Sequence, residues 1–213
     1  MLEVHSFTFN PFSENTYVLT DAQRNAWIID PGMHTASEMA VLNRFMSSRQ
    51  LTLQAILNTH AHIDHILGIP ALLDLHSIPF ALHPLEAPVL AAGASSALMF
   101  GIGTFTPPVV TQHLSEAEPL QLGSHSLNVL LTPGHSPGSV CFYNEADGWL
   151  IGGDVLFNGS IGRTDLPGGD MDTLLNSIRK ELYTLPDTVV VYPGHGPSTT
   201  IGQEKKTNPF VRG

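Results

Sequence analysis

The segment 59–65 constrains this chain more than any other, because it reads Thr-His-Ala-His-Ile-Asp-His and places three imidazoles and a carboxylate close together. Residues two apart share a side of extended backbone, so His60 and His62 can face one ion. Asp64 and His65 can reach a second ion beside it. These donors suit Zn, Mn or Fe, and no thiolate competes with them. The alternative interpretation is a polar loop in which Asp64 caps the next helix.

Three more candidate ligands each follow an apolar strand and a short turn. Residues 129–131 lead through Thr-Pro-Gly to His135, residues 150–151 through Gly-Gly to Asp154, and residues 189–191 through Tyr-Pro-Gly to His195. Residues 56–57 lead in the same way to His60. Strand ends on one edge of a layered α/β fold can converge on one point, as a metal site requires. This repeated placement favours metal ligands over the polar loop.

Composition narrows the class of partner. The chain has 11 His against 9 Lys plus Arg, and its formal charge of −10 argues against nucleic acid, which binds clustered basic residues. No apolar run approaches the roughly 20 residues of a membrane span, and the N-terminus lacks the charged start of a secretory signal. Cys141 is the only cysteine, so no internal disulfide can form. We therefore expect a cytoplasmic protein with a small-molecule partner, and the oligomeric state stays open.

Apolar periodicity predicts a single α/β domain over 1–213. The expected strands are 2–9, 16–20, 25–30, 51–58 and 78–82, and the expected helices are 37–48, 66–76 and 171–185. The stretch 84–111 is rich in Ala, Gly and Pro, and we expect a helix to about Met99 followed by a flap over the site. The remaining histidines lack such motifs and are expected at the surface or in packing, namely His5, His34, His76, His83, His113 and His125.

The combined motifs resemble the metallo-β-lactamase superfamily over nearly the whole chain. They are His60-x-His62-x-Asp64-His65, Pro133-Gly134-His135, Gly153-Asp154 and Pro193-Gly194-His195. The resemblance implies an αββα sandwich with the metal site at one edge of the two sheets. It also implies two divalent ions, with zinc expected first and iron or manganese as alternatives. One ion would be held by His60, His62 and His135, the other by Asp64, His65 and His195, with Asp154 bridging both.

Without a cysteine ligand, the pattern resembles the glyoxalase II branch, and specifically its short, single-domain hydrolases. The implied reaction is cleavage of a thioester such as S-lactoylglutathione by a metal-bound hydroxide, with Asp64 and Asp154 as catalytic residues. A thiolate leaves without a general acid, which favours a thioester over a lactam. Arg163, in Gly162-Arg163-Thr164-Asp165, is expected to bind a substrate carboxylate. Its alternative role is a salt bridge to Asp165 or Asp170.

Two other readings of the same residues stay open. Asn58-Thr59-His60 and residues 162–165 also resemble persulfide dioxygenases, in which His60, His135 and Asp154 would hold one Fe(II). The non-enzymatic alternative is a regulatory binding module in which the metal only stabilises the fold. Seven candidate ligands argue against it, because a structural zinc site needs only four.

Overall fold

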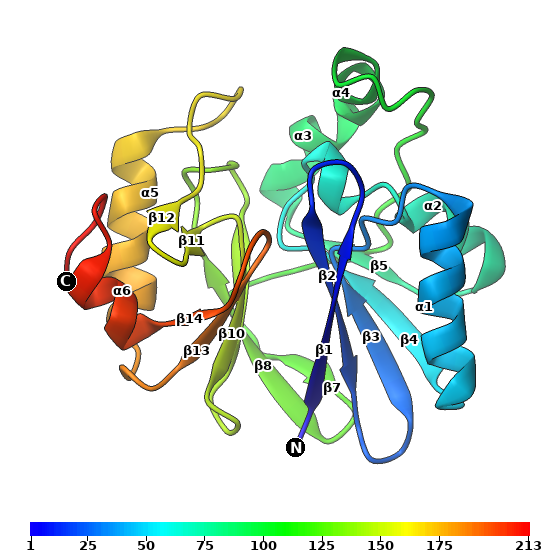
Figure 1. The fold of residues 1–213 in the computed structure, drawn as a ribbon, viewed down its shortest axis with the longest axis horizontal. Coiled ribbons are helices and arrows are strands. Elements are labelled where there is room, and N and C mark those ends of the chain that lie inside the picture. Colours follow the sequence, from blue (N-terminus) through cyan, green and yellow to red (C-terminus); the bar gives the residue numbers. More distant parts are fainter. The chain divides into compact units, whose positions relative to one another are not determined.

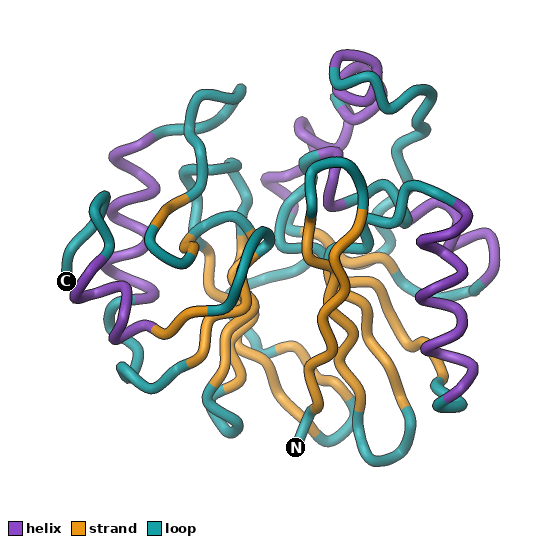
Figure 2. The backbone as a smooth tube through the Cα atoms, in the orientation of Figure 1, coloured by secondary structure: helices purple, strands orange, loops and turns teal.

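The computed structural model describes all residues 1–213, and they form two compact units, Met1–His113 and Leu114–Gly213. Each unit contains one six-stranded sheet and helices on it, so the α/β class is confirmed (Figures 1 and 2). The single domain over 1–213 stays a prediction. None of the helices is both long and apolar enough to cross a membrane.

The first unit is built on a mixed sheet with the strand order β1-β2-β3-β4-β5-β6. The first three strands pair antiparallel, and β3 to β6 pair in parallel. Parallel neighbours end at the same edge, so the residues after β3, β4 and β5 lie along one edge. The bounds are β1 Glu3–Phe9, β2 Glu14–Thr20, β3 Asn25–Ile29, β4 Thr52–Leu57, β5 Phe80–Leu82 and β6 Gln112–His113.

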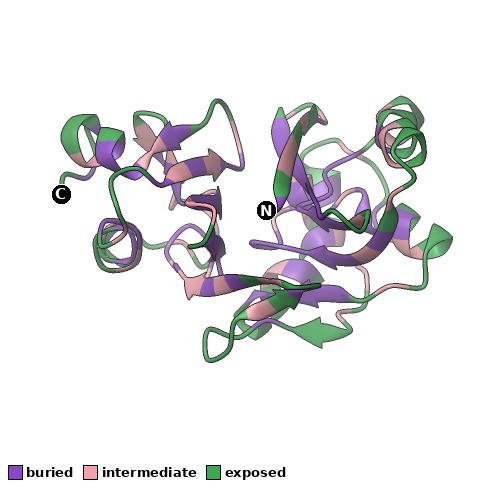
Figure 3. Ribbon diagram, turned by 90° about the horizontal axis from the view of Figure 1, so that it is seen from below, coloured by how far each residue is buried: buried purple, intermediate pink, exposed green.

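Two helices cover one face of this sheet: α1 (Ala36–Ser48) and α2 (Ile69–Leu75). Leu42 of α1 is completely buried in a cluster with Ile28 and Ile56 of the sheet, as its helical spacing predicts. Thr35 begins α1 with a capping box, in which its side chain and that of Glu38 bind each other's backbone N–H groups. Figure 3 shows mostly buried strands beside helices whose outer faces are exposed, and β1 and β6 are the more exposed strands of this sheet.

The structure corrects the helix predictions between the histidine turn and residue 111. The helix expected over 66–76 begins only at Ile69, because residues Ile63–His65 form a separate 3-10 turn, η1. The helix expected from Pro84 to Met99 is three short pieces, η2 (Pro84–Glu86), α3 (Ala87–Ala91) and α4 (Gly93–Met99). Pro88 supplies no N–H and Gly93 has low helix propensity, which favours the interruptions.

The second unit has the strand order β14-β13-β10-β9-β8-β7, with α5 (Met171–Ser177), the π-helical η3 (Ile178–Leu182) and α6 (Ile201–Thr207) packed on it. The helix predicted over 171–185 ends at Leu182, short of Pro186, which disfavours helix in the residue before it. A short hairpin of β11 and β12 follows the sheet strand β10. The bounds are β7 Leu120–Leu122, β8 His125–Leu131, β9 Val140–Asn144, β10 Trp149–Gly153, β11 Leu156–Phe157, β12 Ser160–Ile161, β13 Val190–Pro193 and β14 Thr199–Thr200.

We predict that Leu42→Ala lowers the free energy of unfolding by about 2–5 kcal/mol, because it leaves a cavity under α1. Val41→Ala is the matched control, since Val41 is 48% exposed on the same helix and its truncation should change stability by less than about 0.5 kcal/mol. Urea unfolding followed by circular dichroism measures both. Equal losses for the two variants would contradict the packing of α1.

Candidate metal centre

In the first unit, β4 delivers the histidine turn and η1 completes it. His60 and His65 are completely buried, and the ring centroids of His60 lie 4.9 Å from His62 and 4.2 Å from His65. His65 Nε2 lies 3.6 Å from Asp64 Oδ2. This unit therefore brings together all four residues predicted from segment 59–65, with donor atoms of the kind that divalent metals bind. Asp64 lies inside η1, so it is not the N-cap of that turn.

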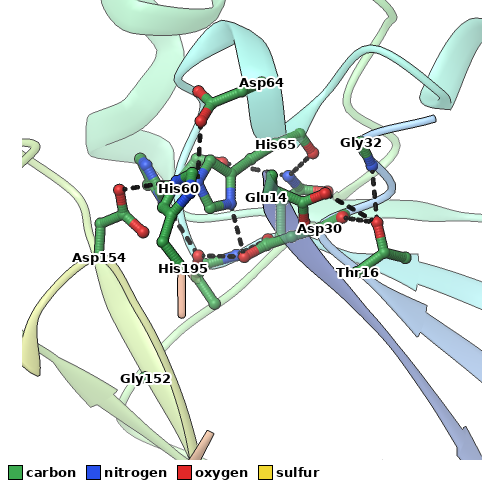
Figure 4. A network of polar contacts seen from close by, with 12 residues as sticks. Glu14, Thr16, Asp30, Gly32, His60, Asp64, His65, Gly152, Asp154 and His195 are labelled. Carbon is green, nitrogen blue, oxygen red and sulfur yellow. Dashed lines mark hydrogen bonds and ion pairs between the residues drawn. The ribbon is translucent and has the colours of Figure 1, made fainter. Parts of the chain in front are cut away.

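Asp30, which follows β3, supports these histidines from behind (Figure 4). Its carboxylate accepts hydrogen bonds from Thr59 N (2.7 Å) and Thr59 Oγ1 (2.6 Å), and lies 3.1 Å from His65 Nδ1. A carboxylate only accepts, so His65 Nδ1 carries the hydrogen and Nε2 keeps its lone pair. Asp30, His60 and His65 offer ligand atoms within 4.8 Å of one another, but both Asp30 oxygens already bind these donors. We therefore assign Asp30 an orienting role.

The hydrogen bonds of Thr59 also determine which nitrogen of the His60 ring carries a hydrogen. Thr59 Oγ1 has one hydrogen and gives it to Asp30, so towards His60 Nδ1, at 3.0 Å, it can only accept. His60 Nδ1 consequently carries a hydrogen and His60 Nε2 has the free lone pair. One buried carboxylate thus sets the tautomer of two predicted ligands.

A second buried carboxyl group lies behind Asp30. Thr16 Oγ1 contacts Glu14 Oε2 and the main-chain oxygen of Asp30, each at 2.9 Å, and accepts from Gly32 N at 2.9 Å (Figure 4). Burial raises the pKa of the Glu14 carboxyl group well above its ordinary value. A Cβ on Gly32 would lie 2.6 Å from the main-chain oxygen of Asp64 and 2.0 Å from Glu14 Oε2, so a larger residue would force the backbone to shift. The turn Asp30-Pro31-Gly32 after β3 is therefore a packed support of the site.

In the second unit, three strands deliver His135, Asp154 and His195 to one edge. β13 pairs in parallel with β10. β8 and β10 both pair antiparallel with β9, so β8 runs in the same direction as β10. The residues after β8, β10 and β13 therefore meet at the same sheet edge. Asp154 Oδ2 lies 3.6 Å from His135 Nε2 and 3.5 Å from His195 Nε2. One carboxylate oxygen is thus flanked by two imidazole nitrogens.

Glycines allow the close packing around these ligands. Gly134 has φ +129°, and a Cβ there would lie 2.3 Å from the backbone nitrogen of Leu174 in α5. A Cβ on Gly162 would lie 1.9 Å from the main-chain oxygen of Asp154 and 3.1 Å from Cβ of His135. The Pro-Gly-His turn and the loop after Asp154 therefore need glycine for contact as well as for conformation.

Arg163 has separate main-chain and side-chain contacts. Its carbonyl oxygen lies 2.7 Å from His135 Nδ1, which must donate to it, so His135 Nε2 keeps its lone pair. Its guanidinium donates to Asp165 at 2.7 and 2.6 Å, and this bond lowers the pKa of Asp165 to about 2. The salt bridge considered from sequence exists, while Asp170 instead caps α5 through Thr173 N. Substrate binding by Arg163 stays a prediction.

Sequence reasoning missed the supporting residues of the site. They are Asp30, Thr59, and Glu86, whose buried carboxylate accepts from Ala61 N at 2.8 Å. The sequence does contain a signal for Asp30, because it follows an apolar strand and stands next to a Pro-Gly pair. His135 and His195 also come after an apolar strand and stand next to such a pair. Glu86 carried none, since it lies in a segment that only the tertiary fold brings to the histidine turn.

Comparison with known proteins gives one family. A family model described as the metallo-beta-lactamase superfamily matches residues 9–195. The chain is 41% identical over 206 residues to the probable metallo-hydrolase YqgX of Bacillus subtilis, covering 95% of this chain and 94% of the relative. It is 35% identical over 202 residues to the hydroxyacylglutathione hydrolase GloC of Haemophilus influenzae, covering 94% and 93%.

Three solved structures are similar over almost the whole chain. BLEG-1, described as a B3 metallo-beta-lactamase, has a TM-score of 0.90 and 41% identity, with 99% of this chain and 100% of that chain covered. TTHA1623, described in a di-iron-bound form, has a TM-score of 0.87 and 38% identity, covering 98% and 100%. ETHE1 from Myxococcus xanthus has a TM-score of 0.79 and 27% identity, covering 97% and 83%.

We predict that Asp30→Asn weakens zinc binding by about 10–100-fold, because an amide cannot accept from Thr59 and His65 with both of its terminal atoms. Asp21→Asn is the matched control, since Asp21 accepts from Gln23 and Asn25 in the turn between β2 and β3. Competition with a chromophoric chelator measures the affinity. A wild-type affinity in Asp30→Asn would show that Asp30 does not orient the ligands.

Proposed function

The chain belongs to the metallo-β-lactamase superfamily, and from this premise we propose that it is a metal-dependent hydrolase that cleaves thioesters of the S-lactoylglutathione type. The predicted metallo-β-lactamase fold is confirmed by the family match and the similar structures. The observation that carries the proposal is the set of hydrogen bonds at Nδ1 of His60, His65 and His135, each made inside its own unit, which leave the Nε2 lone pair for a metal. This pattern directs Nε2 atoms to the proposed site.

The residues fit a pair of divalent ions. His60, His62 and His135 would hold one ion, Asp64, His65 and His195 the other, and Asp154 would touch both. The nitrogen and oxygen donors suit Zn, Fe or Mn, and the thiol of Cys141, the only cysteine, is completely buried and contacts Thr132 and Gly152. Such ions supply Lewis acidity and lower the pKa of water towards 7. We propose zinc first, with iron the alternative that the di-iron form of TTHA1623 supports.

Features of the chain's own residues support a thioester as the substrate. Asp154 and Asp64 would supply negative charge to balance the cations, and the buried rings of His60, His65 and His135 would exclude water from one side of the ions. Cys141 is buried, so it cannot accept an acyl group. A thiolate leaving group needs no proton donor, and the predicted ligand set contains none besides its imidazoles. The similarity to the hydroxyacylglutathione hydrolase GloC supports the same substrate class.

A persulfide dioxygenase is the second candidate, and the similarity to ETHE1 supports it. In that case His60, His135 and Asp154 would bind one Fe(II) as a facial triad. Metal analysis combined with thioester cleavage and oxygen uptake separates the two. The hydrolase should bind about two ions per chain and consume no oxygen with glutathione persulfide. One iron per chain together with rapid oxygen uptake would replace the hydrolase by the dioxygenase.

We predict that Asp154→Asn lowers kcat for thioester cleavage by at least about 100-fold while the chain stays folded, because an amide lacks the charge to span two cations. Asp172→Asn, an exposed change on α5, should keep full activity. Circular dichroism checks folding. Activity of Asp154→Asn within about threefold of wild type, a change below 1 kcal/mol, would reject the bridging role.

We predict that Arg163→Ala raises KM for anionic thioesters by about tenfold, or 1.4 kcal/mol, with a much smaller effect on neutral ones. Asp165→Ala tests the same role from the other side, since it releases the guanidinium and should lower KM for the anionic substrates. Metal content should not change, because the main-chain carbonyl that binds His135 remains. Equal effects on charged and neutral thioesters would leave Arg163 only its salt bridge.

A further inference from the structure

Glu86 is a buried carboxylate that none of the metal-ligand motifs includes. It ends η2, immediately before α3, and its side chain is completely shielded from water. Burying a carboxylate is costly unless hydrogen-bond donors compensate for the lost hydration. One donor is the backbone N–H of Ala61, 2.8 Å from Glu86 Oε2. This hydrogen bond offsets part of the cost of burial, and it joins Glu86 to a residue 25 positions earlier in the chain.

Ala61 lies between His60 and His62, in a stretch that belongs to no helix or strand. Its N–H group consequently has no regular backbone partner, and Glu86 takes that place. The carbonyl oxygen of the same peptide unit, that of His60, accepts from Asn58 Nδ2 at 3.1 Å. Both polar atoms of the peptide plane between His60 and Ala61 are thus bound by side chains.

Holding this peptide plane restricts the backbone from which both histidine side chains extend, directly at His60 and through Ala61 at His62. The His60 and His62 rings lie nearly perpendicular, at 87°, with centroids 4.9 Å apart. Two imidazoles bind one ion well only when their nitrogens are held in suitable positions beforehand, and atoms that support the ligands commonly change metal affinity by 10–100-fold. The backbone hydrogen bond is therefore the means by which Glu86 can act on the metal.

We propose that Glu86 is a positioning residue for the His60-x-His62 pair, acting through the N–H of Ala61. The inference rests on the proposed metal site but not on the thioesterase reaction. It also gives residues 84–86 a function, since they connect β5 to the α3–α4 segment and at the same time support the metal-binding turn.

Zinc affinity, measured by chelator competition, tests the proposal with three variants. Glu86→Leu removes the acceptor while filling the buried volume, and should weaken zinc binding by about 10–100-fold. Glu86→Gln keeps an acceptor oxygen for Ala61 and should recover most of this loss. Asp74→Asn removes one exposed negative charge from the same unit and should bind zinc as wild type does.

Each result decides a separate point. Wild-type affinity in Glu86→Leu would overturn the proposal, and so would Glu86→Gln as weak as Glu86→Leu, because charge would then act instead of the hydrogen bond. A wild-type chain that binds no zinc or iron would reject the proposed function itself.

If Glu86→Leu does not fold, the amide resonance of Ala61 in metal-free Glu86→Gln gives the answer. It should move upfield and exchange faster with solvent, because an amide oxygen is a weaker acceptor than a carboxylate. An unmoved Ala61 resonance would show that Glu86 does not hold this peptide.

Discussion

The hydrogen bonds of Asp30 are the interaction on which the rest of the first unit's site depends. A carboxylate cannot donate, so the hydrogens of Thr59 Oγ1 and His65 Nδ1 both point to Asp30, and Thr59 in turn requires a hydrogen on His60 Nδ1. The imidazoles would otherwise be free to present either nitrogen. Because Asp30 is almost completely buried, water cannot replace Thr59 or His65 as its hydrogen-bond donor. The fold therefore determines which atoms donate and which accept.

The second unit reaches the same result with a main-chain acceptor. His135 donates to the carbonyl of Arg163, which any residue at that position would supply. The two supports therefore differ in how they tolerate mutation. Asp30 can be lost through a change of one side chain, whereas the acceptor at 163 is lost only if the loop moves. Gly162 limits such movement, because the loop lies in contact with the backbone at Asp154.

Local patterns predicted the strands that lead to the candidate ligands, but not the supporting residues or the strands β6, β7, β9, β11, β12 and β14. Strand ends followed by Gly-Asp or Pro-Gly-His could be recognised, because apolar runs and turn residues are local signals. The division of residues 84–99 into three pieces was not predicted, since the alanine-rich composition favours a continuous helix and outweighed the local signals of Pro88 and Gly93. Glu86 was invisible for a related reason, because its partner at Ala61 is near it only in the folded chain.

The contact between Gly134 and Leu174 has a consequence for how such a chain can change over time. A Cβ on Gly134 would lie 2.3 Å from the backbone nitrogen of Leu174, so the turn that carries His135 packs directly against the backbone of α5. Neither element can drift alone, because even one methyl group on the turn would displace the helix. We therefore expect that an insertion, deletion or substitution in one of these two segments requires a compensating change in the other. Divergent copies of this unit should show correlated changes in the two segments, even where the candidate ligands stay the same.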